Sequence, residues 1–143
     1  MEDREIEGGV RFEVLSIGVV HSTLLDRSAA PKQAWEGAPQ ARIEIHPAYR
    51  DCLLGLEAGQ EIWIFTWFHQ ARRSVFQVHP RGLIGNPLMG VFATRSPDRP
   101  NPIGLHRATI TSVDPAGWLT VDALEAIDGT PVADIKPALE CRT

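Results

Sequence analysis

Several features that identify common classes of protein are missing from this sequence. It has only two cysteines, Cys52 and Cys141, which lie far apart and form no Cys-x-x-Cys pair. Cysteines this sparse are more often reduced than joined in a disulfide, and their spacing is not that of a zinc site, so we expect no metal. No apolar run approaches the roughly 20 residues that a membrane-spanning helix needs, so we expect no membrane partner.

Motifs of the commoner enzyme classes are also absent. No Gly-x-Gly-x-x-Gly segment follows a strand-like run, no P-loop is present, and strands do not alternate with helices, which disfavours a Rossmann domain. The chain has 5 histidines and several serines. It has neither a nucleophile elbow nor a His-Glu-x-x-His pattern, so a hydrolase is the least supported enzyme class.

The length and composition fit one globular domain. The 143 residues suffice for a sizeable core, and 43% hydrophobic with 22% charged residues is ordinary for a soluble protein. The chain starts with acidic and polar residues, unlike a secretory leader, so we expect a cytoplasmic location. We expect residues 1–10 to be a disordered tail and residues 11–143 to be a single domain without a C-terminal extension.

The pattern of apolar residues predicts a mostly β fold. Alternating or continuous short apolar runs bounded by Pro, Gly and Asp predict strands, and Pro47 opens a short helix that ends near Gly59. We expect Tyr49, Leu53, Leu54 and Leu56 to lie on its apolar face. The predicted strands span residues 12–21, 41–46, 62–68, 74–78, 90–93, 103–113, 118–127 and 132–137. With turns at residues 114–117 and 128–131, they indicate an antiparallel barrel or sandwich with long Pro-rich loops.

The net charge of −4 hides an uneven distribution along the chain. Residues 1–69 carry six basic and eleven acidic groups, and residues 114–143 carry two and six. Residues 70–113 carry six arginines, no lysine and only Asp98 as an acidic group. Guanidiniums are planar bidentate donors, so this middle third suggests a defined site for an anionic partner such as phosphate.

The most distinctive segment is residues 90–105, GVFATRSPDRPNPIGL. Its three prolines fix their own φ angles and push the preceding residues toward extended conformations, so it can be neither a helix nor an interior strand. We interpret it as a stiff loop, which we call the proline loop, that holds Arg95, Arg99 and Asn101 in a nearly fixed arrangement. The alternative is a purely structural connection whose arginines are solvated.

Two other places carry candidate site residues. His69 and Gln70 follow the strongest predicted strand, where polar side chains often point into a pocket, although a lone histidine is as often structural. The long irregular segment from 22 to 40 contains Pro31-Lys32-Gln33 and Trp35. Long loops are often functional, and Trp35 either stacks on a flat ligand or packs under the loop as local core.

Three motifs together resemble the TrmO/YaeB family, whose domain is also called TsaA-like. They are GVFATRSPDRPNPIGL, the FHQ of residues 68–70 and the DGTPVADIKP of residues 128–137, with Pro31-Lys32-Gln33 as a fourth, weaker match. The resemblance covers residues 12–139. It implies a compact antiparallel β-barrel with one or two short helices rather than a Rossmann fold. It also implies a methyltransferase that depends on S-adenosyl-L-methionine (SAM). It further implies methylation of N6 of threonylcarbamoyl-adenosine next to the anticodon of tRNA, and a homodimer.

The resemblance also assigns roles to particular residues. It implies a cofactor pocket made of Pro31, Lys32, Gln33, His69, Gln70, Arg95, Leu105, Asp128, Gly129, Thr130 and Pro131. An exocyclic amine needs a nearby proton acceptor, for which Asn101 and Asp134 are candidates. We expect Arg72, Arg73, Arg99 and Lys136 to contact the RNA or its threonylcarbamoyl group, with Arg99 also close to the chemistry.

Two departures from the family leave alternatives open. His106 stands where the family typically has a serine, and the chain ends at Thr143 without the additional C-terminal domain of the better-known bacterial enzymes. The substrate is then either tRNA, another RNA or a small molecule. A non-catalytic SAM-binding module is the remaining alternative.

Overall fold

The protein is described by a computed structural model covering residues 9–30 and 36–139. The candidate residues Pro31, Lys32 and Gln33, together with Trp35 and Cys141, lie outside this described part of the chain.

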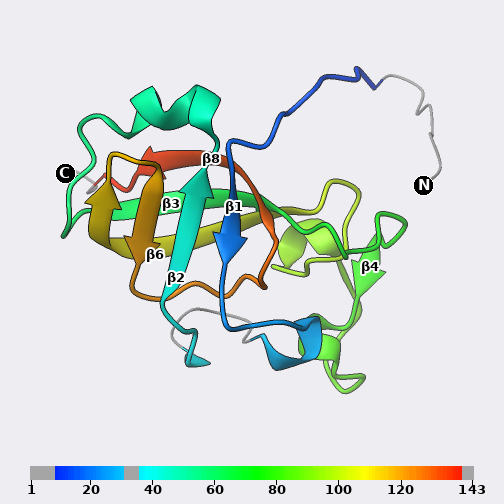
Figure 1. Cartoon of the computed structure of the whole chain (residues 1–143). Coiled ribbons are helices and arrows are strands. Elements are labelled where there is room, and N and C mark those ends of the chain that lie inside the picture. Colours follow the sequence, from blue (N-terminus) through cyan, green and yellow to red (C-terminus); the bar gives the residue numbers. More distant parts are fainter. Residues whose placement is uncertain (1–8, 31–35, 140–143) are drawn as a thin grey trace.

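Six antiparallel strands form a closed barrel, which confirms the mostly β prediction (Figure 1). Around the barrel the order is β1-β2-β7-β6-β3-β8. The strands are β1 (Gly18–His21), β2 (Ala41–Ile45), β3 (Glu61–Trp67), β6 (Ile103–Asp114), β7 (Trp118–Val121) and β8 (Pro131–Pro137). The longest pairings are those of β3 with β6 and with β8. The sequence predicted a central strand here; in a closed barrel every strand has two neighbours, and β3 is the strand with the longest ladders on both sides.

The period-2 pattern of the strands separates the core from the outer surface. Along β3, Ile62, Ile64 and Thr66 point into the barrel, while the aromatic residues between them are half-buried on the outside. The buried core cluster comprises Val20, Ala41, Ile43, Ile45, Leu53, Ile62, Ile64, Ala108, Ile110, Leu119, Val121, Leu124, Ala126 and Val132. Burying each large aliphatic side chain stabilises the fold by about 1.5–3 kcal/mol.

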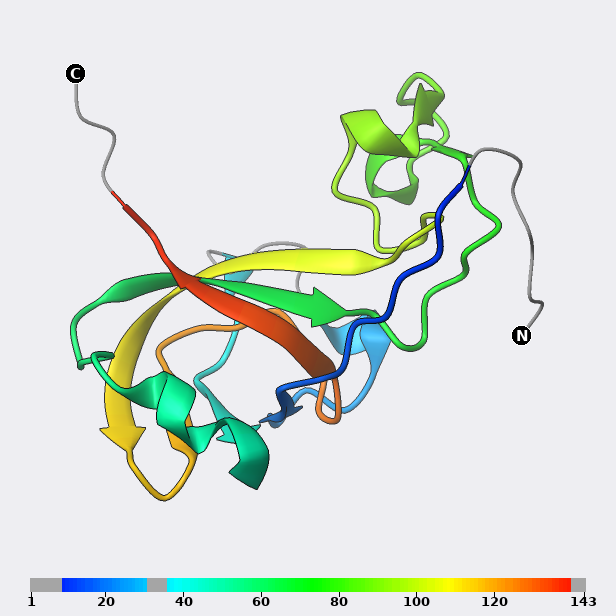
Figure 2. The ribbon, with the colours of Figure 1, turned by 90° about the horizontal axis from the view of Figure 1, so that it is seen from above.

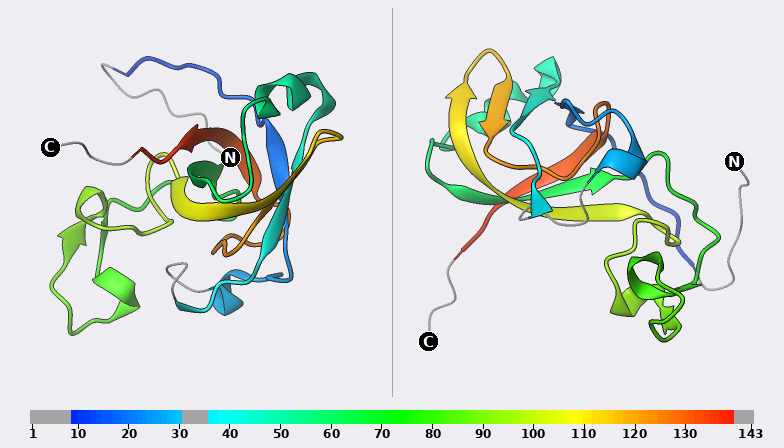
Figure 3. Two further views of the ribbon diagram at one scale, coloured as in Figure 1. Left: turned by 90° about the vertical axis from the view of Figure 1, so that its left-hand side faces the viewer. Right: turned by 90° about the horizontal axis from the view of Figure 1, so that it is seen from below.

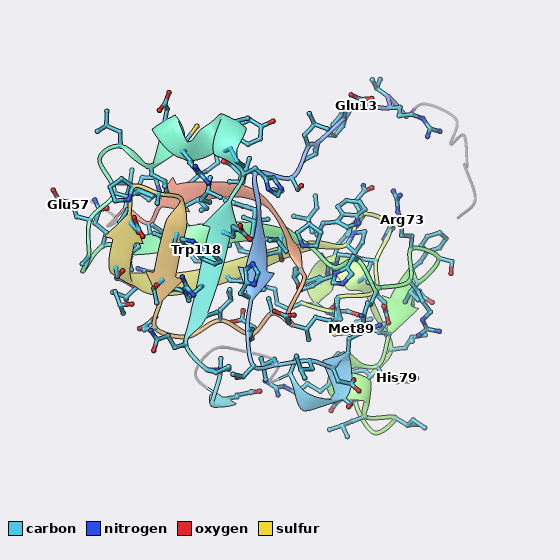
Figure 4. The ribbon with its side chains drawn as sticks, in the orientation of Figure 1. Glu13, Glu57, Arg73, His79, Met89 and Trp118 are labelled. Atoms are coloured by element: carbon cyan, nitrogen blue, oxygen red, sulfur yellow. The ribbon has the colours of Figure 1, made fainter. Side chains whose placement is uncertain are left out.

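The predicted first strand is too long. Only Gly18–His21 forms β1, because β2 and β8 offer pairing partners from Gly18 onward. Residues 9–17 form an extended arm that leads away from the barrel, and Val10 and Phe12 on it are exposed (Figures 1 and 4). The Ile17 amide donates to the Val132 carbonyl of β8, and the Ile17 carbonyl accepts from the His46 amide, so pairing with the barrel begins at the last residue of the arm. The alternating apolar residues before Ile17 lie outside the strand ladders of the described residues.

Three other predicted strands are shorter than expected. Residues 74–78 contain only β4 (Gln77–Val78), and residues 90–93 contain the end of β5 (Met89–Gly90) followed by the 3-10 turn η5 (Val91–Ala93). Residues 118–127 contain only β7, because the chain turns after Val121 and the Leu124 amide donates to the Pro39 carbonyl rather than to β6. The turn at residues 114–117 is confirmed, with Gly117 at a φ of 114° that favours glycine.

The helical segments are all short. The helix expected after Pro47 is the 3-10 segment η3 (Pro47–Leu53), which buries Leu53 but leaves Leu54 93% exposed, so Leu54 was wrongly assigned to its apolar face. The other 3-10 segments in the described residues are η1 (Arg27–Ala29), η4 (Pro80–Gly82) and η5.

A second substructure lies beside the barrel. The segment between β3 and β6 carries the two-stranded sheet β4-β5 with η4 and η5, and we call residues 71–100 the side lobe. Figures 2 and 3 show it, in green, set off from one end of the barrel. Its two connections to the barrel are the candidate segments His69-Gln70 and the proline loop, so the lobe and the candidate residues share this end.

Candidate functional site

The barrel topology brings most candidate segments to one end. Because β3 and β6 are antiparallel with Trp67 opposite Ile103, the residues after β3 lie beside those before β6, and the Phe68 amide donates to the Pro102 carbonyl over 2.8 Å. β8 is antiparallel to β3 with Val132 opposite Thr66, so the turn at residues 128–131 lies at this end as well. Segments from three parts of the sequence therefore meet where the family motifs were found.

The turn at residues 128–131 is bound to the loop that follows β1. The Ser22 amide donates to Asp128 Oδ1 over 3.0 Å, and the Asp128 amide donates to the Leu24 carbonyl over 2.6 Å. The Gly129 amide donates to the Val20 carbonyl over 2.8 Å. The buried hydroxyl of Thr130 donates back to the Ile127 carbonyl, closing the turn. Asp128 is thereby held in place at the surface, with Thr130 and Pro131 leading directly into β8.

An ion-pair junction joins three loops at the same end. Arg27 donates through Nη1 to the Gln70 carbonyl over 3.1 Å and lies 3.3 Å from Asp98 Oδ1 through Nη2. The Arg72 amide donates to the same carboxylate over 2.8 Å. The junction therefore ties the loop after β1 to the segment after β3 and to the proline loop, and it places Gln70 beside the proline loop.

Asp98 at this junction has a depressed pKa. Its partial burial on its own would raise the pKa, but the hydrogen bond from the Arg72 amide and the charges of Arg27 and Arg72 outweigh burial and lower the pKa below 3.8. The ionised carboxylate is thus the form that the folded protein favours.

The Asp98 junction should weaken in acid. Since the folded-state pKa is depressed, the stabilisation is complete above the unfolded-state pKa of about 4 and is lost as the pH falls through the folded-state value. We expect Asp98→Asn to lower the thermal midpoint by a few degrees at neutral pH, and we expect this difference to shrink below about pH 4. Calorimetric scans between about pH 3 and pH 7 measure it. Asp51→Asn, in η3, is the control, and a wild-type-minus-variant difference that does not change with pH would contradict this role for Asp98.

Arg99 holds the proline loop together from inside. Its Nε donates to the Ser96 carbonyl over 2.9 Å, and its Nη2 donates to the carbonyls of Thr94, over 2.7 Å, and Val91. The Ser96 amide donates to the Thr94 hydroxyl, and the Ser96 hydroxyl donates to the Asp98 carbonyl. The loop is stiff because of these bonds as well as its prolines, and these donors of Arg99 serve the loop backbone.

Two further candidates lie on the rim of the proline loop. Arg95 is exposed and directs Nη1 toward the Leu105 carbonyl at 3.5 Å, so the structure brings together two residues assigned to the cofactor pocket. Arg73 donates through Nε to the Pro100 carbonyl over 2.7 Å and through Nη2 to Asn101 Oδ1 over 2.9 Å. Its guanidinium also lies 5.2 Å from the ring centre of Trp67, and Figure 4 shows it at this end.

Asp134 and Lys136 lie on a different surface. Both are exposed on the outside of β8, where Asp134 Oδ1 accepts from the Ile135 amide and lies near the Lys136 ammonium, whose Nζ is 3.7 Å from Oδ2. Phe65 of β3 is paired with Asp134 of β8 on one side and with Leu105 of β6 on the other. Asp134 and Leu105 are therefore separated by two strand spacings, or about 10 Å across the sheet.

A buried group that the sequence did not single out lies beneath this end. His106 is 1% exposed and points into the barrel, where Nε2 is 2.7 Å from the Thr66 hydroxyl and Nδ1 is 2.7 Å from Glu125 Oε1. In the sequence His106 was only a departure from the family pattern. No spacing rule links it to residues 40 positions before and 19 positions after it.

A surface hollow lies beside this end rather than at the proline loop. Its volume is about 500 Å³, and it is lined by His21, Ser22, Thr23 and residues 39–42. Through Ser22 it borders the Asp128 turn, but neither Arg95 nor Leu105 lines it. We therefore place the candidate site by its converging polar groups. In the described residues no cluster of three or more His, Cys, Asp or Glu could hold a metal ion, and no helix is long and apolar enough to span a membrane.

Comparisons with known proteins agree on one family. Residues 19–141 match the tRNA-methyltransferase O N-terminal domain. A probable S-adenosyl-L-methionine-binding protein of Methanothermobacter thermautotrophicus is 40% identical over 140 residues, which cover 98% of this chain and 95% of that protein. The tRNA (adenine(37)-N6)-methyltransferase of Escherichia coli is 39% identical over 137 residues, covering 90% of this chain and 58% of that enzyme.

Solved structures show the same fold. A crystal structure of TrmO from Pseudomonas aeruginosa superposes with a TM-score of 0.73 at 33% identity, covering 94% of this chain and 57% of that one. This chain therefore spans just over half the length of that protein and of the E. coli methyltransferase, and nearly the whole length of the archaeal relative.

Proposed function

The chain belongs to the family of the tRNA-methyltransferase O N-terminal domain, and from this premise we propose that it binds S-adenosyl-L-methionine and methylates N6 of an adenine in tRNA. The observation that carries the proposal is the convergence of Gln70, Arg95, Leu105 and the Asp128 turn at one end of the barrel. As the finer substrate we propose threonylcarbamoyl-adenosine next to the anticodon.

The polar groups at this end fit the cofactor. SAM supplies an electrophilic methyl group on a sulfonium, and it also carries an adenine, a ribose diol and an amino-acid tail. The exposed Arg95 guanidinium would bind the tail carboxylate. Asp128 uses Oδ1 for the Ser22 amide, and within the described residues Oδ2 accepts no hydrogen bond, which leaves it for a ribose hydroxyl or the tail ammonium. His69 and Gln70, with Gly129 to Pro131, would complete the wall, together with Pro31, Lys32 and Gln33.

The residues around the proline loop would position the acceptor. Asn101 Oδ1 accepts from Arg73 and keeps a second lone pair, which can take a hydrogen bond from the N6 amine. Asp134 is the second candidate acceptor, from the outer face of β8. Arg72, whose side chain is 74% exposed, together with Arg73 and Lys136 would contact phosphates or the threonylcarbamoyl carboxylate. Arg99 would act near the chemistry by holding the loop. Alignment by these groups and exclusion of water would supply most of the acceleration.

Titration calorimetry with SAM and transfer of a labelled methyl group to tRNA lacking the N6 mark test the proposal. We expect binding and labelling, and we expect Arg95→Ala to weaken SAM binding by about 10- to 100-fold because a charge-assisted hydrogen bond contributes about 1.5–3 kcal/mol. Arg107→Ala is the control, because Arg107 pairs with Glu61 at the other end of β3. Binding without transfer to any RNA would favour a non-catalytic SAM-binding module, and an absence of binding would refute the proposal.

We also propose a homodimer formed through the side lobe. The lobe exposes several large apolar side chains, which is unusual for a surface that faces only water: Phe76, Leu83, Ile84, Leu88, Met89 and Phe92. A groove of about 230 Å³ lined by Phe76, Gly90, Val91, Phe92 and Pro100 lies among them. The groove borders the proline loop, so a second copy seated there would lie next to the candidate site.

Light scattering after gel filtration tests the dimer. Phe92→Asp places a charge in the middle of this apolar surface and should give a monomer, whereas the wild type should have twice the monomer mass. Leu54→Asp is the matched control, because Leu54 is about as exposed as Phe92 but directly follows η3, which lies away from the lobe (Figure 1). A wild-type monomer, or a Phe92→Asp dimer, would contradict the proposal.

A further inference from the structure

Three polar side chains lie inside the barrel, and we call Thr66, His106 and Glu125 the polar core cluster. Thr66 is fully buried, His106 is 1% exposed and the Glu125 side chain is 9% exposed. His106 lies in the middle, with both ring nitrogens 2.7 Å from an oxygen. The ring of Phe68 packs edge-on against the imidazole, with the centroids 5.7 Å apart.

The hydrogen bonds fix the orientation of the imidazole ring. An ionised carboxylate only accepts, so with Glu125 ionised Nδ1 of His106 carries the proton, and Nε2 is free to accept from the rotatable Thr66 hydroxyl. Glu125 Oε2 is buried and has no hydrogen-bond partner among the described residues. Burying a carboxylate with one oxygen unsatisfied is costly, and an apolar residue of similar size would fill the same space at lower cost. The cluster therefore has a use other than packing.

The position of each member indicates that use. Thr66 lies just before the segment that carries His69 and Gln70, His106 directly follows Leu105, and Glu125 is three residues before Asp128. Hence the cluster joins, from within, the three elements that deliver the candidate cofactor residues. β3 and β6 are also joined by ladder bonds, but the segment that holds Glu125 is not part of a strand. The His106–Glu125 contact is thus a direct polar link between β6 and the segment leading to the Asp128 turn.

We propose that His106 and Glu125 are positioning residues, which hold the Asp128 turn at a fixed place relative to Leu105 and Gln70 and thereby shape the cofactor site. The role in methyl transfer rests on the proposed function. The mechanical role does not, because it concerns the order of this end of the barrel in the protein without cofactor.

Hydrogen exchange in the absence of cofactor tests the mechanical role. His106→Phe keeps a ring but removes both hydrogen bonds, and we expect exchange of the Phe68 and Gly129 amides to accelerate at least 10-fold. These amides donate to Pro102 and Val20 at the site end. The Gly59 amide, which donates to Ile110 at the far end, should change much less. Equal acceleration of exchange at both ends would show general destabilisation and would overturn the proposal. Unchanged exchange at the site end would overturn it as well.

SAM affinity tests the functional part. We expect His106→Phe and Glu125→Gln to weaken SAM binding by at least 10-fold. His106→Asn, whose amide nitrogen can replace Nδ1 as donor to Glu125, should recover most of the affinity. Ile110→Val at the far end provides a comparable core change and should leave affinity within about 2-fold. Affinity that simply follows thermal stability across all four variants would overturn the proposal. If the wild type itself bound no SAM, the proposed function would fail, and the exchange experiment would still decide the mechanical role.

Discussion

Replacing Gly104 by alanine should unfold or severely loosen the site end of the barrel and abolish SAM binding. Gly104 is a buried residue of β6, paired with Thr66 of β3, and it faces the polar core cluster. A Cβ at this position would overlap the Thr66 hydroxyl and would lie 2.5 Å from Cζ of Phe68 and 2.8 Å from Nε2 of His106. Real Cβ atoms essentially never come so close to other heavy atoms, so the hydroxyl, the ring and the imidazole must all move.

The expected loss of unfolding free energy is about 3–5 kcal/mol. Overpacking a core costs about 1–3 kcal/mol, and leaving a buried polar group without its hydrogen bond costs about as much again. For a chain of this size that corresponds to a fall in the thermal midpoint on the order of 10–20 °C. Calorimetric unfolding, followed by SAM titration of the folded variant at low temperature, measures both effects.

Gly85→Ala is the matched control for this substitution. Gly85 lies in the side lobe with an ordinary φ, and a Cβ there would meet no described atom within 4 Å. Its replacement should leave the thermal midpoint and the SAM affinity nearly unchanged. A Gly104→Ala protein as stable as the Gly85→Ala protein would mean that β6 moves outward easily, contrary to the close packing described above.

Arg99→Ala is expected to reduce the kcat/KM of methyl transfer by about 100-fold while the barrel stays folded. Removing the guanidinium takes a donor from the carbonyls of Thr94 and Ser96 and leaves the Val91 carbonyl with only the Thr94 amide and hydroxyl, so the proline loop loses much of its internal support. A displacement of catalytic groups of about 1 Å can cost about 100-fold in rate. Steady-state assays with labelled SAM and tRNA measure the loss, and far-ultraviolet circular dichroism reports the fold.

Two comparisons separate this role from a simple loss of charge. Arg99→Lys should rescue little, because a single ammonium cannot replace the planar fork that reaches several carbonyls at once. Arg107→Ala removes the same charge at the other end of β3 and should leave turnover within about 2-fold. Limited proteolysis should cut residues 94–101 of the Arg99→Ala protein faster than those of the wild type. Unaltered proteolysis and turnover would show that the prolines alone keep the loop in place.

The parts of the fold that the sequence predicted well are those whose local pattern and tertiary role agree. The predicted strands at 41–46, 62–68, 103–113 and 132–137 lie within about a residue of β2, β3, β6 and β8. Their inward residues are mostly apolar, with Thr66 and His106 as polar exceptions, and each strand has a partner on both sides of the closed barrel. The arm at residues 9–17 has a similar pattern, but its pairing with the barrel begins only at Ile17, and no property of the residues themselves shows where pairing starts.

The sequence indicates which segments contribute to the candidate site, but it does not show which partners their side chains bind. The motifs assigned Gln70, Arg95, Leu105 and Asp128 to one cofactor pocket, which stays a prediction, and the fold brings these residues to one end of the barrel. The arginine-rich middle third suggested an anionic partner, yet Arg99 donates to its own loop, and Arg81 and Arg107 pair with Glu36 and Glu61. A charge count cannot distinguish an arginine that faces a ligand from one that binds backbone carbonyls.

The way in which the cylinder closes has a thermodynamic consequence. The ladder of β1 with β8 pairs two positions, Gly18 with Val132 and Val19 with Pro131, and proline has no amide hydrogen to contribute there. The seam is otherwise held by the bonds from the amides of Ile17, Val20 and Gly129 to the carbonyls of Val132, Thr130 and Val20. Breathing of the cylinder should cost least along this seam, which runs beside Asp128. A small molecule that contacts both β1 and β8 across the seam would hold the two strands together. Its occupancy would then set the global stability of the domain, which would rise by RT ln(1 + [L]/Kd) as the ligand concentration [L] increases.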